Sequence, residues 1–116
     1  MVRRTNEKET VRKPAPFSGT GDITVRNLLN GPKEMNGKGR VFSHTTVYPG
    51  SAIGYHVHQG DSETYYILRG KGRYNDNGTL TTVEAGDVTY TAPGCGHGIE
   101  CISKEPLEMI ALILYE

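Results

Sequence analysis

The sequence predicts an all-β chain folded as a sandwich or a barrel, and three observations lead to this prediction. Short runs of β-branched and aromatic residues recur along the chain. Turn-forming residues separate these runs, with 15 glycines and 6 prolines among 116 residues. No segment places apolar residues at the spacing of three and four that an amphipathic helix needs, so helix should be nearly absent.

Strands are expected in quick succession from residue 23 onward. The predicted ranges are 23–29, 40–47, 52–57, 64–68, 71–75, 79–83, 86–93, 97–101 and 109–115. The dipeptide Asn77-Gly78 tolerates the positive φ angles of a type I′ turn and should join two of these strands in a hairpin. The last strand is apolar on both faces, so both faces should be covered. In a one-domain barrel, a second subunit can provide the outer cover.

The start of the chain differs from the rest in composition. Residues 1–16 carry five basic and two acidic side chains and the two prolines of the sequence KPAP. We expect residues 1–22 to form an N-terminal arm that is partly disordered or docked on a partner subunit. The basic excess could bind phosphate, but such a run is more often simply solvated. Residues 23–116 should form a single domain, which is a usual size for one hydrophobic core.

The composition argues against several classes of function. Thirteen basic and thirteen acidic residues give a formal net charge of zero, so neither nucleic acid nor an anionic membrane is expected as the main partner. No apolar run reaches the roughly 18 residues of a membrane-spanning helix. The polar N-terminus lacks the apolar core of a secretory signal. Cys95 and Cys101 are too few for a disulfide framework, so we expect a cytoplasmic protein with reduced thiols.

The stretch from residue 50 to residue 70, GSAIGYHVHQGDSETYYILRG, concentrates candidate metal ligands. Side chains alternate between the two faces of a strand, so His56 and His58 share a face and lie about 6 to 7 Å apart along the backbone. The turn that follows lets Glu63 begin a neighbouring strand and approach the histidines from the side.

A second glycine-rich stretch, residues 86–101, supplies His97. Its sequence GCGHG is not expected to bind phosphate, because a phosphate-binding loop precedes a helix and the following HGIEC is typical of a strand.

These two stretches resemble the two signatures of the cupin superfamily. The first signature places Gly, His, His, Glu and Gly at set spacings, and the stretch from Gly50 to Gly70 meets every one of them. In the second signature, the distance from Gly86 to His97 matches, whereas Pro93 and the glycine after it are displaced by one residue. Cys101 stands where the family often has asparagine. The resemblance covers roughly residues 40–115.

The resemblance implies a double-stranded β-helix, a jelly-roll barrel that holds a metal in its mouth. Carried over position by position, the implied metal ligands are His56, His58, Glu63 and His97. Three imidazoles and one carboxylate suit one divalent first-row transition metal with one or two open positions. The sequence does not distinguish among Mn, Fe, Ni, Co and Zn. Without a cation, this set of side chains would be costly to bury.

Strand alternation also indicates side chains for a substrate pocket. Tyr65 lies two residues from Glu63, and Ile99 lies two residues from His97, so each shares the inward face of a ligand. The substrate-binding candidates are Tyr65, Ile53, Ile99 and Met109. Ordinary core packing is the commoner role of such residues. No acid–base pair apart from the metal ligands is evident, so no catalytic residue is named.

Two functions from different classes follow from the resemblance and the ligand set. One is an enzyme whose metal polarises a small carboxylate, dicarbonyl or enol substrate, with oxalate-decarboxylase-like, dioxygenase-like or isomerase chemistry. The other is a non-catalytic module that binds or senses a small molecule. The complete ligand set favours the enzyme. A homodimer is expected in either case, because single-domain cupins commonly pair.

Overall fold

The computed structural model describes all residues, 1–116, and consists mainly of ten strands. In chain order the strands are β1 (Thr10–Pro14), β2 (Asp22–Leu29), β3 (Gly39–Val47), β4 (Ala52–Val57), β5 (Asp61–Arg69), β6 (Lys71–Asp76), β7 (Thr79–Glu84), β8 (Val88–Thr91), β9 (Gly96–Cys101) and β10 (Leu107–Tyr115). The nine strands expected from the sequence all form. Helix is confined to η1 (Thr5–Glu7) and α1 (Gly31–Glu34), and neither is long and apolar enough to cross a membrane.

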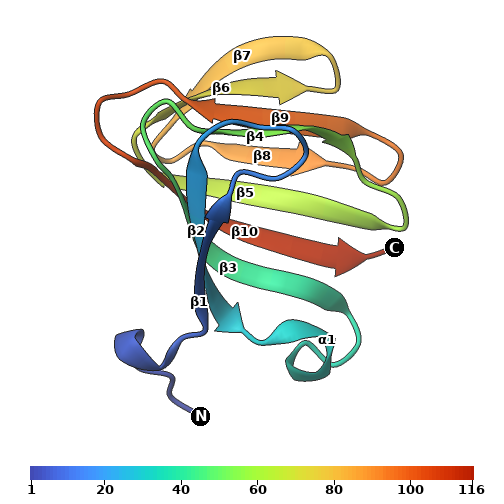
Figure 1. Ribbon diagram of the computed structural model, residues 1–116. Helices are drawn as coiled ribbons and strands as arrows, with labels where there is room; N and C mark the ends of the chain where they lie inside the picture. Colours follow the sequence, from blue (N-terminus) through green and yellow to red (C-terminus); the bar gives the residue numbers. More distant parts are fainter.

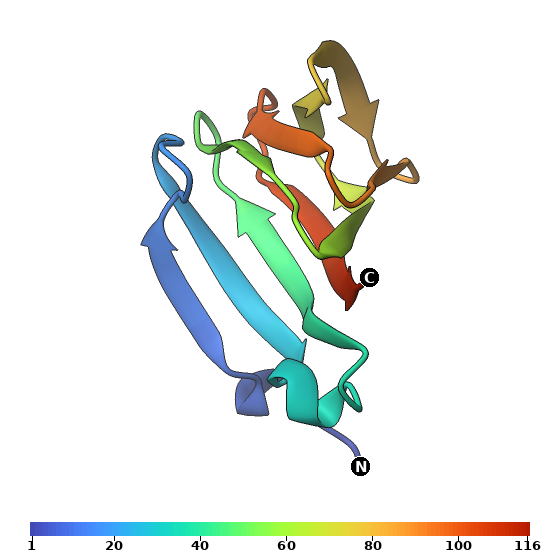
Figure 2. The same cartoon turned by 90° about the vertical axis from the view of Figure 1, so that its right-hand side faces the viewer.

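The strands form two antiparallel sheets that face one another. The larger sheet has six strands in the order β1-β2-β3-β10-β5-β8, and the smaller has four in the order β4-β9-β6-β7. Figure 1 shows the strands stacked across both sheets, and Figure 2 shows the sheets as two layers. This arrangement confirms the predicted jelly-roll fold, although the two sheets do not join into one closed, hydrogen-bonded barrel.

Glycine corners carry the chain from one sheet to the other. Gly70 joins β5 of the six-stranded sheet to β6 of the four-stranded sheet and has φ +82°. A Cβ atom at this position would lie 2.5 Å from the carbonyl oxygen of Pro106, so a side chain is excluded by space as well as by backbone conformation. The predicted hairpin turn is confirmed as well, since Asn77 and Gly78 both have positive φ between β6 and β7.

The hydrophobic core lies between the two sheets. Twelve buried residues form it, including Val47, Ile67, Ile99, Leu107 and Met109. Along β10, alternate side chains face this space, because Leu107, Met109, Ala111 and Ile113 are all buried.

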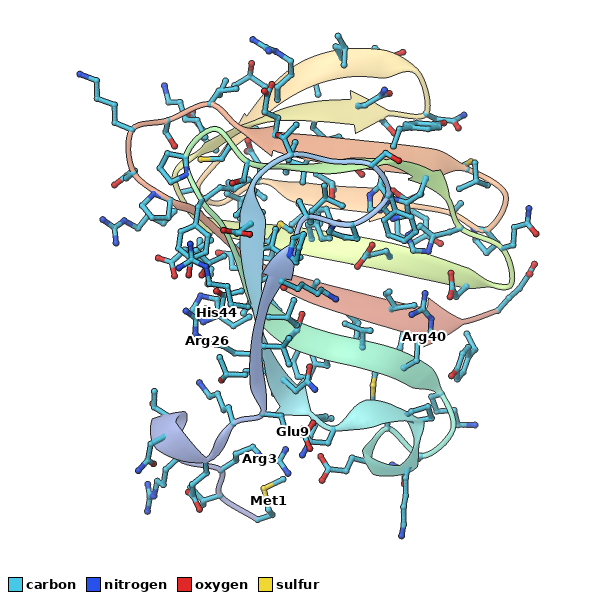
Figure 3. All side chains as sticks on the ribbon, viewed as in Figure 1. Met1, Arg3, Glu9, Arg26, Arg40 and His44 are labelled. Carbon is cyan, nitrogen blue, oxygen red and sulfur yellow. The ribbon has the colours of Figure 1, made fainter.

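The opposite face of β10 is only half-covered by this chain, since Ile110 and Leu112 remain partly exposed. Its neighbours on that face include His44, which contacts Glu108 at 3.0 Å between Nε2 and Oε1. Figure 3 shows His44 close to Arg26, with which it pairs across β3 and β2. The outer cover expected for this strand is therefore not supplied within the chain.

The N-terminal segment packs against its own chain at several points. Residues 10–14 form β1, which pairs with β2 at the edge of the six-stranded sheet. Arg3 donates hydrogen bonds to the carboxylate of Glu34 in α1, at 2.9 and 3.0 Å. Docking of residues 1–22 on a partner subunit stays a prediction.

Candidate metal centre

Four side chains from three regions of the chain converge between the sheets, beside the hydrophobic core. His56 lies on β4, His58 directly follows that strand, Glu63 lies on β5 and His97 lies on β9. Their potential ligand atoms all lie within 4.8 Å of one another. The structure thus brings together the four residues that the resemblance singled out.

Local backbone geometry aims the histidines at one another. The pairing of β4 with β9 changes register between Ile53 and His56, which is the mark of a β-bulge. Because of this bulge, His56 lies directly opposite His97 in the ladder. His58 lies just beyond the end of β4, and the turn that follows it leads into β5 of the six-stranded sheet, where Glu63 lies.

Hydrogen bonds at Nδ1 fix how each imidazole is presented. The Nδ1–H of His56 donates to the carbonyl oxygen of Gly54 at 2.8 Å, and that of His58 donates to the carboxylate of Asp61 at 2.7 Å. The third ring, His97, contacts the Tyr74 hydroxyl through Nδ1 at 2.9 Å. With Nδ1 occupied in this way, Nε2 of each ring is left to face the common centre.

The potential ligand atoms at the centre lie very close together. Nε2 of His58 lies 3.1 Å from Nε2 of His97, and the same Glu63 oxygen lies 3.1 and 3.0 Å from these two atoms. If both rings carried a proton only on Nδ1, two lone pairs would face each other across 3.1 Å. A proton on one of the two Nε2 atoms, or a metal ion between them, removes this repulsion.

Ionisation of the site follows from the same contacts. Burial would raise the pKa of Glu63, but hydrogen bonds from His58 and His97 outweigh it and lower the pKa to about 2. The hydrogen bond to Glu63 raises the pKa of His58 against the effect of burial, and Asp61 adds to this rise. Burial lowers the pKa of His56. Glu63 is therefore a carboxylate at neutral pH.

The donor set fits a transition metal. Ligand atoms bound about 2.1 Å from one ion, at right angles, lie about 3.0 Å apart. The separations among Glu63, His58 and His97 are 3.0 to 3.1 Å. Three imidazole nitrogens and one carboxylate oxygen suit divalent first-row metals. A His₃Glu site that could hold one metal ion is thus present.

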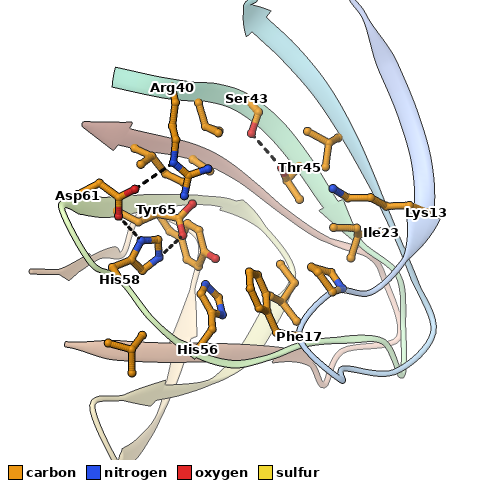
Figure 4. A pocket seen from close by; sticks show the side chains of 18 of the residues that line it. Lys13, Phe17, Ile23, Arg40, Ser43, Thr45, His56, His58, Asp61 and Tyr65 are labelled. Atoms are coloured by element: carbon orange, nitrogen blue, oxygen red, sulfur yellow. Dashed lines mark hydrogen bonds and ion pairs between the residues drawn. The ribbon is translucent and has the colours of Figure 1, made fainter. Parts of the chain in front are cut away.

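Sequence reasoning missed the residues that support the ligands. Asp61 accepts from His58 and also accepts a hydrogen bond from Nε of Arg40 at 3.0 Å, as Figure 4 shows. A signal for Asp61 was present, because it precedes Glu63 by two residues and so shares its face of β5. Tyr74, which contacts both His97 and Thr91 at 2.9 Å, carried no such signal.

The centre opens into a cavity of about 550 Å³. Apolar side chains make up much of its wall, namely Ile23, Val25, Val41, Ile53, Ala111 and Ile113. Its polar lining includes the hydroxyls of Ser43, Thr45 and Tyr65 and the cations Lys13 and Arg40. Figure 4 shows Arg40 and Lys13 on opposite sides of this pocket.

The four candidate substrate contacts all belong to the buried core, but only two of them reach the cavity. Tyr65 and Ile53 line the cavity, whereas Ile99 and Met109 are not part of its wall. Tyr65 also stacks on His97, with ring centroids 5.0 Å apart. Burial, followed by the charge of Glu63, raises the pKa of Tyr65 well above its usual value, so its hydroxyl stays protonated.

Known proteins share this sequence and this arrangement. Residues 43–113, more than half of the chain, match the family described as the cupin domain. The chain is 38% identical over 114 residues to an oxalate-binding protein of Thermotoga maritima, covering 98% of this chain and 93% of that one. It is 31% identical over 110 residues to an uncharacterized protein of Methanocaldococcus jannaschii, covering 95% and 87% of the two chains.

Solved structures agree with the fold. The crystal structure of a predicted oxalate decarboxylase from Thermotoga maritima has a TM-score of 0.94, is 37% identical and covers 100% of both chains. The structure of KdgF from Halomonas sp. has a TM-score of 0.75, covers 100% of this chain and 96% of its own, and is 13% identical, so that likeness concerns the fold alone. From its matched domain, its relatives and its two facing sheets, the chain belongs to the cupin family.

Proposed function

We propose that this protein holds one divalent transition metal through His56, His58, Glu63 and His97 and binds a small carboxylate beside it, with oxalate as the first compound to test. One observation carries the proposal. The four ligand atoms gather at one end of a cavity whose wall also contains two cationic side chains, Lys13 and Arg40.

Charge and polarity in the cavity support an anionic ligand. Arg40 is already paired with Asp61, at 3.0 Å, which leaves Lys13 as the cation available to a ligand. The hydroxyls of Ser43 and Thr45 are buried and lie 3.1 Å apart. In this pair, one hydroxyl donates to the other, and the accepting hydroxyl keeps a proton for a ligand oxygen. The relative named as an oxalate-binding protein supports the same ligand class.

The metal, when bound, would supply a Lewis acid that attracts and polarises a carboxylate. The chain contributes the rest of the site. Asp61 and Gly54 hold the rings of His58 and His56 in place. The apolar wall excludes water around the ligand and strengthens every charged contact inside. Small-molecule sites usually combine an apolar wall with a few polar groups or a metal that orient the bound compound.

The first test is metal content, followed by ligand binding. Protein purified without a metal-affinity tag or chelator is analysed by plasma mass spectrometry for Mn, Fe, Ni, Co and Zn. Metal-loaded protein is then titrated with oxalate in a calorimeter, with acetate as the comparison. We expect near-stoichiometric metal and preferential binding of oxalate. Protein that arrives empty and takes up none of these ions would contradict the proposal.

Turnover is a second candidate function, and Tyr65 favours it. Its protonated hydroxyl lines the cavity beside Glu63 and can donate a hydrogen bond to charge that develops on a bound substrate. Oxalate decarboxylation consumes one proton, because oxalate and a proton yield formate and carbon dioxide. The same loaded protein is therefore assayed for formate. Oxalate binding without formation of formate would support the non-catalytic binding function instead.

We also propose that the chain forms a homodimer in the cytoplasm. The outer face of the six-stranded sheet carries an apolar patch made of Tyr66, Leu68, Val88 and Tyr90. Each of these side chains is between 42 and 64% exposed in the single chain. Covering such a patch would be favourable, and a second copy of this chain supplies a matching surface. The two free cysteines suit a reducing compartment.

A further inference from the structure

A segment outside the matched cupin domain reaches the metal centre. Residues 15–21, here called the strap, connect β1 to β2 and cross to the four-stranded sheet, where Thr20 and Ala52 form an isolated bridge. The matched domain begins at residue 43, so the strap lies well before it. Pro16 and Phe17 of the strap line the cavity, and Figure 4 shows Phe17 next to His56.

Phe17 stacks on the ring of His56. The two ring centroids lie 3.8 Å apart and the planes differ by only 12°, which is a nearly parallel stack. The Phe17 side chain is 57% exposed, so burial in the core does not account for its position. Phe17 and Ser18 both have φ +59°, a conformation that residues other than glycine rarely adopt.

The backbone around the strap holds Phe17 in this conformation. Two hydrogen bonds join Thr20 and Ala52, at 2.9 and 3.0 Å, and the amide of Gly54 donates to the carbonyl of Pro16 at 3.0 Å. A Cβ atom on Gly54 would overlap the carbonyl oxygen of Phe17, so the close approach depends on glycine. The carbonyl of that same Gly54 accepts the Nδ1–H of His56. The strap and the ligand ring are thus anchored at one residue.

His56 is the ligand that needs such support. His58, Glu63 and His97 are buried and contact one another directly, whereas His56 is half-buried and its Nε2 has no hydrogen bond to the other three. One hydrogen bond at Nδ1 leaves the ring free to tilt about its bond to the backbone. A parallel ring on one face restricts that tilt.

We propose that Phe17 is a positioning residue for His56, holding its imidazole so that Nε2 points at the metal; this inference rests on the proposed metal site. The strap is then a structural part of the centre rather than a cover over the cavity. Hydrogen-bonding partners that orient a metal-bound histidine are typically worth about 10- to 100-fold in affinity, and we expect the stack to act at the lower end of that range.

The test compares Phe17→Leu with Phe17→Tyr and uses Co²⁺ as the probe. Leucine keeps an apolar side chain of similar size but removes the flat ring, whereas tyrosine restores the stack. The chain offers a matched control in its only other phenylalanine, Phe42, which lies on β3 and does not line the cavity. Affinity is measured by calorimetry, ligand geometry by the visible absorption spectrum of bound Co²⁺, and folding by the melting temperature of the metal-free protein.

We expect Phe17→Leu to weaken Co²⁺ binding by about tenfold and to change the Co²⁺ spectrum, while Phe17→Tyr and Phe42→Leu match the unmodified protein. If Phe17→Leu does not fold, Phe17→Met takes its place. Unchanged affinity and spectrum in the folded variant would overturn the positioning role while leaving the metal site standing. If the unmodified protein binds no Co²⁺ or other candidate metal, the proposed function fails and the positioning role fails with it.

Discussion

Asp61 accepts a hydrogen bond from Nδ1 of His58 at 2.7 Å, and its other oxygen accepts one from Arg40 at 3.0 Å. This carboxylate fixes both the orientation and the tautomer of a ligand ring. Asp61→Asn keeps the shape of the side chain but loses the charge. We expect it to weaken metal affinity by about 10- to 100-fold, measured by calorimetry with Co²⁺. The control is Asp22→Asn, since Asp22 forms an exposed ion pair with Arg12. Equal losses in both variants would contradict a specific role for Asp61.

Metal binding should release a proton, and affinity should rise with pH. The pKa of His58 is raised, chiefly by its hydrogen bond to Glu63, so the metal-free protein keeps an extra proton on this ring up to a higher pH than a free imidazole does. A metal needs the Nε2 lone pair and displaces that proton. The pKa of His56 is lowered and that of Glu63 is about 2, so neither needs to lose a proton near neutral pH. Affinity should therefore fall as pH drops through the raised pKa of His58.

Calorimetry in two buffers with different ionisation enthalpies counts the released protons. His44→Gln serves as the control, because His44 lies on the outer face and contacts Glu108. An affinity that does not change between pH 6 and 8 would rule out displacement of a proton from His58.

Lys13 should contribute to carboxylate affinity and not to metal affinity. It lines the cavity but is not among the four ligands. Lys13→Met should weaken oxalate binding up to about fivefold, as expected for an exposed charge pair, and Lys13→Arg should retain it. Co²⁺ affinity should be the same in both. Lys104→Met, an exposed lysine outside the cavity, is the control. If Lys13→Met leaves oxalate affinity unchanged at low salt, Lys13 does not contact the bound oxalate.

Met109 should matter for stability rather than for ligand binding. It is 1% exposed and packs in the core. Met109→Ala should lower the free energy of unfolding by about 2 to 5 kcal/mol, measured by urea denaturation. Oxalate affinity should not change. Ile113→Ala is the comparison, because Ile113 is on the same strand and lines the cavity. A larger effect of Met109→Ala than of Ile113→Ala on oxalate affinity would restore Met109 as a substrate contact.

The apolar patch should mediate a dimer. Light scattering at micromolar concentration should give twice the chain mass of 12.7 kDa. Val88→Glu places a charge in the middle of the patch and should produce the monomer. The control is Val11→Glu, at a side chain that is 55% exposed on β1. If the unmodified protein is a monomer, the proposed dimer is wrong. If Val88→Glu remains a dimer, the interface lies on another surface.

The sequence predicted the ligands better than their surroundings, for a physical reason. A period of two along a strand tells which face a side chain occupies, and this placed His56 and His58 together, whereas the resemblance to the cupin signatures implied Glu63 and His97. The same period does not tell how deeply a side chain lies between the two sheets. Met109 and Ile113 share a face of β10, yet one lies in the core and the other in the cavity wall.

The sequence also did not predict contacts between segments that are far apart along the chain. Phe17 stacks on His56 only because the strap crosses between the sheets with two consecutive residues at positive φ. The prolines and glycines around them mark a turn, but neither residue is glycine, so the sequence does not single out these two positions for positive φ. The charge run of residues 1–16 was informative about solvation but not about the edge strand that part of it forms.

The strap gives this small protein a modular design. The four metal ligands lie between residues 56 and 97, whereas Lys13 and Phe17 reach the same cavity from the first 22 residues. Changes in residues 1–22 can therefore alter which small molecule enters the cavity and how tightly it binds, without changing any of the four metal ligands. Exchanging the leading segments of two such chains is consequently a direct way to transfer ligand preference between them while the metal centre is kept.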